Sequence, residues 1–190
     1  MYINKLFYLI IGVLLLSTGC AQLQLSEPTA SIETVQKLKT IDPKPLQVGD
    51  FVPLETKESG WDTAVTIRGS ALYSPVDKSF SLYLRELLIV ELKTAGYLDP
   101  ESSTIISGVL SENYLNGAGI KTGEGKLGAI FKVLKNGQTL YDKEVLVSHT
   151  WPSSFAGAVA IPAAANEYNA LYRKLITKLI EDDEFQAAIE

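Results

Sequence analysis

The sequence predicts an α+β domain: a mostly antiparallel sheet of about five strands with two main helices packed on one face. Three observations predict this class. Apolar residues spaced three and four apart mark two long helices, and apolar residues that alternate with polar ones mark several strands. The pair Asn136-Gly137 stands between two alternating stretches and is a strong signal for a hairpin, because both turn positions take positive φ.

The first elements after the N-terminal region are short. Residues 21–30 lack a clear period and contain Pro28, so we interpret them as a tether. Between Ser31 and Lys39, apolar residues recur every three positions, and Ser31 is a suitable N-cap for a short helix. Two strands are expected next, over 46–54, with Gly49 at a bulge, and over 61–72.

The most clearly marked helix follows these strands. Ser74 and Pro75 suit the cap and first helical position, and Gly96 suits a left-handed C-terminal cap. Its apolar face is wide enough to be buried on more than one side. The residues that define this face are Phe80, Leu84, Leu87, Leu88, Leu92 and Ala95.

A three-stranded meander and a second long helix complete the pattern. Strands are expected over 104–115, 127–133 and 140–151, with a glycine-rich loop from Asn116 to Gly125 that would contact a partner if it has a function. The last long helix is expected from Pro162 to Ile180, with one more helical turn over 185–189.

The first twenty residues follow the plan of a secretory signal. Lys5 is the only charged residue before Glu27, and Leu6 to Leu16 is an apolar run of about eleven residues. A membrane-spanning helix needs about 20 residues, so the run suits a cleaved signal better than a permanent span. It ends in the small residues Ser17-Thr18-Gly19, which precede Cys20, the only cysteine of the chain.

These residues resemble the lipobox of bacterial lipoproteins, although Ser17 stands where that family usually has leucine. The resemblance implies cleavage before Cys20 and attachment of lipid to its thiol. It also implies outer-membrane sorting, with inner-membrane retention less favoured, because Ala21 is not aspartate. The alternative is an ordinary signal peptide cut elsewhere. We therefore predict a signal peptide over 1–19, a lipidated tether over 20–30 and one periplasmic domain over 31–190.

Composition narrows the classes of function. Removal of residues 1–19 would leave 171 of 190 residues, and because Lys5 is the only charge removed, the net charge would change from −5 to −6. A mildly acidic domain is poorly suited to nucleic acid, whose partners carry basic patches. With Cys20 lipidated, no cysteine remains for a disulfide, so the fold must rest on its core.

The sequence shows no catalytic or metal-binding pattern. His149 is the only histidine, no nucleophile elbow is present, and we interpret His149 as a sheet residue bonded to a neighbour. One histidine and one lipidated cysteine make a zinc site improbable. We therefore expect no enzyme activity, no metal and no cofactor.

The most unusual segment joins the last strand to the last helix. It contains the candidate partner-surface residues Trp151, Phe155, Gly157, Val159 and Ile161. We favour a packed crossover in which Gly157 lies close to another backbone. The alternative is an exposed surface for an apolar partner or for lipid, since an apolar patch of this kind usually marks an interaction site.

The order of elements resembles small periplasmic α/β envelope lipoproteins of the YajG-like and LpoB-like kind, in pattern only and loosely over 46–180. With an anchor, a domain and no catalytic pattern, the sequence favours a non-catalytic accessory or scaffold that contacts another envelope protein. The alternative is a binding module for an apolar ligand, lipid or peptide. An enclosed apolar cavity would favour the second function, and a packed core with an exposed apolar patch would favour the first.

Overall fold

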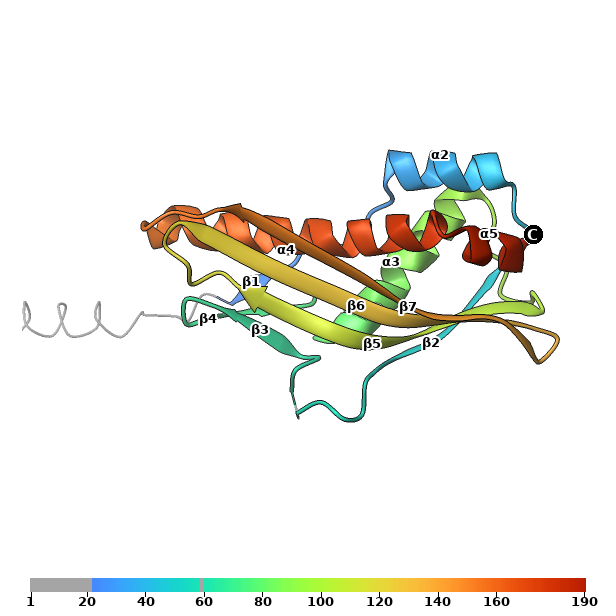
Figure 1. Cartoon of the computed structure of the whole chain (residues 1–190), viewed down its shortest axis with the longest axis horizontal. Coiled ribbons are helices and arrows are strands. Elements are labelled where there is room, and N and C mark those ends of the chain that lie inside the picture. Colours follow the sequence, from blue (N-terminus) through green and yellow to red (C-terminus); the bar gives the residue numbers. More distant parts are fainter. Residues whose placement is uncertain (1–21, 59) are drawn as a thin grey trace, which may run out of the picture.

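The computed structural model describes residues 22–58 and 60–190, so the predicted signal peptide and Cys20 lie outside the described residues. Two sheets and four helices form the described part (Figure 1). The strands are β1 (Leu23–Gln24), β2 (Gln47–Pro53), β3 (Ala64–Ile67), β4 (Ser70–Tyr73), β5 (Thr104–Asn116), β6 (Thr122–Lys135) and β7 (Gln138–Pro152). The helices are α2 (Ile32–Ile41), α3 (Phe80–Ala95), α4 (Gly157–Ile180) and α5 (Asp183–Ile189).

The larger sheet has the order β2-β5-β6-β7. Strands β5, β6 and β7 form the predicted antiparallel meander, and β2 joins it in parallel to β5. The β2 register shifts between Val48 and Phe51, which confirms the bulge expected at Gly49. Asn136 and Gly137 both have positive φ, at 50° and 82°, which confirms the predicted hairpin turn.

The smaller sheet has the order β1-β4-β3 and was not expected. The single strand predicted over 61–72 is wrong: this stretch forms a hairpin of β3 and β4. Arg68 and Gly69 make the turn with φ of 51° and 81°, a conformation that Gly69 takes without cost. Leu23 and Gln24, which we had assigned to the tether, pair in parallel with β4.

The helices form two further layers behind the larger sheet (Figure 1). Helix α3 packs against β2 and β5, and α4 runs along β6 and β7. Helix α2 packs on α3 and α4 rather than on the sheet. No helix in residues 22–58 and 60–190 is both long and apolar enough to span a membrane.

Large side chains fill the space between the sheet and the helices. An aromatic cluster lies at the contact of α3 with α4, where Tyr83 and Tyr172 pack edge to face at 5.0 Å between ring centroids. Phe80 and Tyr168 pack in the same way at 5.8 Å, and all four rings are almost completely buried. Such pairs add stability beyond the area they bury.

The predicted α+β class is confirmed, but the predicted architecture is wrong. One five-stranded, mostly antiparallel sheet with two helices is replaced by two mixed sheets and, in the described residues, four helices. Part of the difference comes from the split of 61–72 into β3 and β4. The rest comes from β1 and β2, which each pair in parallel with a strand far along the chain, and local patterns do not report such pairings.

Both long helices begin elsewhere than predicted. Helix α3 begins at Phe80 and not after Ser74, because Asp77 and Lys78 adopt positive φ. Ser79 is its N-cap and accepts a hydrogen bond from the amide of Leu82. Helix α4 begins at Gly157, five residues before the predicted start at Pro162, so part of the predicted crossover is helical.

Candidate functional site

Three connections meet at one end of the molecule. They are the β3–β4 turn at 68–69, the β5–β6 loop over 117–121 and the β7–α4 connection over 153–156. Figure 1 shows this end on the left, next to β4. We call this end the tip.

The side chain of Arg68 joins the three connections. Its guanidinium donates hydrogen bonds to the carbonyl oxygens of Gly117 at 3.1 Å, Gly119 at 3.0 Å and Phe155 at 2.9 Å, and also to that of Ser154. The planar guanidinium has five N–H donors in a fixed arrangement, which suits several carbonyls at once. Arg68 therefore fixes where the two longer connections lie.

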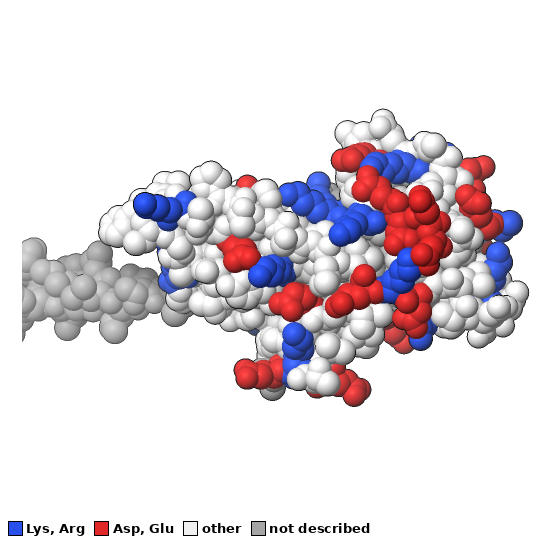
Figure 2. Space-filling view, viewed as in Figure 1, with Lys and Arg blue, Asp and Glu red and all other residues white. Residues whose placement is uncertain are grey.

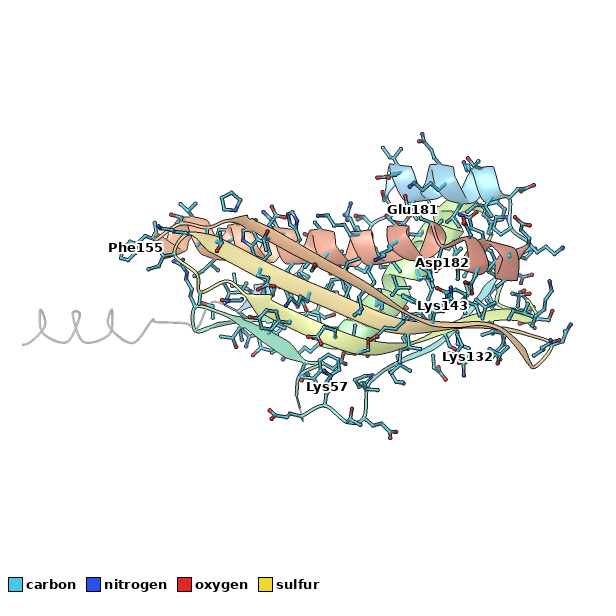
Figure 3. All side chains as sticks on the ribbon, in the orientation of Figure 1. Lys57, Lys132, Lys143, Phe155, Glu181 and Asp182 are labelled. Atoms are coloured by element: carbon cyan, nitrogen blue, oxygen red, sulfur yellow. The ribbon has the colours of Figure 1, made fainter. Side chains whose placement is uncertain are left out.

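The tip exposes large apolar side chains. Phe155 is 82% exposed, Ile120 61% and Val159 59%. Figure 3 labels Phe155 at the extreme end of the molecule, pointing away from the domain. The segments 66–70, 116–122 and 153–161 contain no acidic residue, and their only charges are Arg68 and Lys121.

The structure separates the five residues that the sequence singled out as a partner surface. Trp151 is buried, and a Cβ at Gly123 would lie 2.4 Å from its indole ring. Ile161 is half-buried against the core, whereas Phe155 and Val159 are exposed. The close backbone approach that we favoured at Gly157 is wrong, because a Cβ there would meet only Ile161 Cδ1, at 3.8 Å.

The only histidine lies beside Trp151 on the inner face of β7. His149 stacks on that ring at 6.2 Å between centroids, and its Nε2 lies 3.2 Å from Oε2 of Glu167 on α4. This is the neighbour-bonded sheet histidine that the alternation predicted. The contacts with Trp151 and Glu167 hold the imidazole between β7 and α4.

The segment that precedes α2 is bound along the domain rather than free. The amide of Leu25 donates to the carbonyl of Tyr73 at 3.0 Å, and the Tyr83 hydroxyl donates to the carbonyl of Ser26 at 3.1 Å. Arg173 then binds Thr29 Oγ1 at 2.6 Å. We call residues 23–31 the strap. Because its first residues pair with β4, the chain is fixed to the domain only three residues after Cys20.

The strap ends on a buried carboxylate. Oε1 of Glu91 on α3 accepts a hydrogen bond from the amide of Ser31 at 2.8 Å, whereas Oε2 is buried without a partner. Burial raises the pKa of Glu91, and the Ser31 amide and Arg173 oppose the change. Among the described residues, Glu91 is the only charged residue that is buried.

The opposite end of the molecule is rich in charge (Figure 2). Lys143 on β7 pairs with Asp182 at 3.8 Å and with Glu184, and Lys37 pairs with Glu33 at 3.4 Å and with Glu181. Figure 3 shows Lys143, Glu181 and Asp182 near one another at this end, away from Phe155. We call it the charged end.

In the part of the chain that the structure describes, no three metal-ligating side chains of His, Cys, Asp or Glu gather in one place.

The buried phenols in the core are held protonated, since burial raises the pKa of Tyr83 to about 12 and raises those of Tyr168 and Tyr172 as well. These groups stabilise the core and are not placed to exchange protons near neutral pH.

An open groove of about 720 Å³ lies on the outer face of the larger sheet. Arg85 reaches it from α3 and donates to the carbonyl of Gly49 at 2.8 Å. The apolar part of its lining comes from β2, β5 and β6 and consists of Val48, Val52, Ile105, Val109, Ile130 and Leu134. The groove is open to solvent and does not enclose a ligand.

No protein-family model and no curated protein matches the sequence. Among solved structures, the chain is similar to protein XCC0632 of Xanthomonas campestris, of the family DUF330, with a TM-score of 0.55 and 12% identity over 84% of this chain and 92% of that chain. This likeness shows a shared fold.

Two further solved structures that resemble the chain are lipoproteins by name. Rare lipoprotein B of Shewanella oneidensis has a TM-score of 0.37 and 12% identity, covering 71% of this chain and 88% of that one. A minor lipoprotein of Acinetobacter baumannii has a TM-score of 0.37 and 12% identity, covering 77% and 94%. These scores are too low to carry an argument about function.

Sequence reasoning missed two residues of the tip. Arg68 lay inside a stretch interpreted as one strand, and only the Arg68-Gly69 pair could have indicated a turn there. Ile120 lay in the glycine-rich loop, which was interpreted as a connection between two strands that would contact a partner only if it has a function. Neither residue is near the 151–161 segment in sequence, so only the fold brings them together.

Proposed function

We propose that the protein is an envelope lipoprotein, anchored by lipid on Cys20 in the outer membrane and facing the periplasm, with a non-catalytic accessory or scaffold function toward another envelope protein. The observation that carries this proposal is the lipobox-like Ser17-Thr18-Gly19-Cys20 directly after an apolar run of signal length. Strand β1 begins three residues after Cys20, at Leu23, so a lipid on Cys20 would hold the domain close to the membrane.

The form of the domain supports a non-catalytic role. Aromatic rings pack between α3 and α4, and the buried carboxylate of Glu91 binds the strap through the amide of Ser31. Exposed apolar residues at the tip and an open sheet face offer surfaces to larger partners instead.

The test of the anchor is the variant Cys20→Ser in the full chain. We expect an unprocessed precursor that no longer incorporates radiolabelled palmitate and no longer fractionates with the outer membrane. Gln22→Ser is the matched control, because it changes an exposed residue two positions on and should leave processing and labelling unchanged. Normal maturation and labelling of Cys20→Ser would contradict the proposal.

A binding module for an apolar ligand or peptide is the second candidate, and the open groove on the outer sheet face favours it. The two functions differ in what accompanies the purified protein. Extraction of the envelope in mild detergent should yield a stoichiometric protein partner for a scaffold, and a small molecule or peptide for a binding module. Substitution of Val109→Lys on the outer face should abolish only the second kind of complex.

A further inference from the structure

We propose that the tip rests on the phospholipid bilayer that holds the anchor, so that Ile120, Phe155 and Val159 insert into its interfacial region and the domain stands end-on on the membrane. The inference rests on the proposed lipidation of Cys20. It adds an orientation and a second, non-covalent membrane contact.

The first step is the length of chain available. Cys20 precedes Leu23 by three residues, and three residues span at most about 11 Å. Leu23 itself is fixed, since it pairs with Leu72 of β4. A lipid on Cys20 therefore cannot lie far from the start of β1, and the bilayer must come equally close.

The second step is the direction in which the chain leaves. Strand β1 is parallel to β4, and β4 begins at Ser70, immediately after the 68–69 turn. The amino end of β1 consequently points toward that turn. Figure 1 shows β1 beside β4, in the half of the molecule that contains the tip.

The third step joins this turn to the apolar residues. Arg68 lies in the turn, and its guanidinium is within about 3 Å of the carbonyls of both Gly119 and Phe155. Ile120 follows Gly119 directly, and Val159 lies one helical turn after Phe155, where its amide binds the carbonyl of Ala156. The anchor and the exposed apolar side chains are thus on one end of the molecule.

Charge favours a lipid surface as the occupant. The chain has 22 acidic residues, yet the tip segments 66–70, 116–122 and 153–161 have none and carry Arg68 and Lys121. Anionic phospholipids attract basic residues and repel acidic ones. The tip is therefore suited to a bilayer, and the charged end is suited to face away from it.

The test measures the depth of the tip in the full, lipidated protein. Because Cys20 is the only cysteine and its sulfur is blocked by lipid, Phe155→Cys introduces a single free thiol. This thiol is labelled with the fluorophore NBD, and the protein is placed in vesicles of phosphatidylethanolamine and phosphatidylglycerol that contain doxyl-labelled lipid. We expect several-fold stronger quenching at position 155 than at control positions.

Two control positions are available. Ile32→Cys matches the exposure of Phe155, at 78% against 82%, but lies at the start of α2. Leu140→Cys lies beside the β6–β7 turn at the charged end. Val159→Cys is a second tip position and should behave like Phe155→Cys.

Each outcome decides the matter. Equal quenching at positions 155, 159 and 32 in lipidated protein would overturn the tip contact and leave the anchor intact. A second result would also overturn it: position 155 is shielded from a soluble quencher in native membranes, but doxyl-labelled lipid does not quench it in vesicles that contain no other protein. That result would assign the tip to a protein partner. Mass spectrometry that finds no acyl chains on Cys20 would overturn the proposed function itself, and the inference with it.

Discussion

Different interactions stabilise the two ends of the molecule, the tip and the charged end. At the tip, one arginine binds main-chain carbonyls of loops that carry no acidic residue. At the charged end, exposed lysines and carboxylates on β7, α2 and the α4–α5 connection form ion pairs. From this comparison we expect the end with few charges to depend more on one charged residue than the end with many.

The reason is solvation. Carbonyl oxygens at the tip have directional bonds to a guanidinium that is itself half-buried, and its removal would leave several acceptors without that donor. Ion pairs at the charged end lie in water, where both partners are well solvated when separated and where salt screens them. We therefore expect unequal effects of substitution at the two ends.

The largest effect is expected for Arg68→Ala. Loss of charge-assisted bonds to Gly117, Gly119 and Phe155 should lower the free energy of unfolding by about 2–4 kcal/mol, since such bonds contribute about 1.5–3 kcal/mol each and water replaces part of them. Urea unfolding measures the change. Arg68→Lys keeps the charge without the planar arrangement of donors and should recover less than half of the loss. Full recovery by lysine would show that charge alone matters at the tip.

A pair of glycine substitutions sharpens the description of the tip. Gly123→Ala should cost about 1–3 kcal/mol, because its Cβ would lie 2.4 Å from the buried ring of Trp151. Gly157→Ala is the control and should be neutral or slightly stabilising, because it adds a helix-favouring residue where only Ile161 is near. Thermal melting distinguishes the two. A destabilising Gly157→Ala would restore the packed crossover that the sequence favoured.

Local sequence signals predicted those elements that local physics determines. The 136–137 turn, the bulge at Gly49 and the α3 cap at Gly96 each depend on the backbone freedom of a few neighbouring residues. The parallel pairings of β1 with β4 and of β2 with β5 join segments about 50 and about 60 residues apart, and no periodicity reports them. The start of α3 was misplaced because Ser74-Pro75 looks like a cap, whereas Asp62 binds the amide of Ser81 and helps to fix the actual start.

The candidate site was predicted only in part, for a related reason. The alternation along β7 placed His149 correctly, and the apolar segment 151–161 did contain two exposed residues of the tip, Phe155 and Val159. Hydrophobicity alone could not tell them from Trp151, which is buried over two glycines of β6. Burial depends on what the neighbouring strand contributes, and that strand lies about 25 residues earlier in the chain.

Glu91 offers a smaller test on the side of the molecule that carries α2. Because burial raises its pKa in the folded state, the folded protein binds this proton more tightly than the unfolded chain does. The stabilisation that this proton gives is complete below the ordinary glutamate pKa of about 4.5. It is lost as the pH rises through the raised pKa of Glu91 in the folded protein. Glu91→Gln should raise the melting temperature at pH 7 by about 2 °C and flatten its dependence on pH above 4.5.

The control for this test is Glu86→Gln, which makes the same substitution at a half-exposed carboxylate on the same helix. Differential scanning calorimetry from pH 4 to pH 8 measures both variants. A Glu91→Gln protein that melts lower at pH 7 than the unsubstituted protein would show that the ionised carboxylate stabilises the strap through Ser31. In that case the strap would depend on charge, as the ion pairs of the charged end do.

The smallest effect is expected at the charged end, for Lys143→Ala. The side chain of Lys143 is 39% exposed, and although its bonds to Glu184 and Asp182 raise its pKa, both carboxylates remain solvated without it. Exposed ion pairs contribute little to the free energy of unfolding, so the melting temperature should fall by less than about 2 °C. The decrease should be smaller still in 0.5 M salt, because the Debye length is then only about 4 Å. Lys132→Ala, which breaks the pair with Asp142, is the matched comparison. If Lys143→Ala instead destabilised the protein as much as Arg68→Ala at every salt concentration, the charged end would be held by its ion pairs, and the contrast with the tip would be wrong.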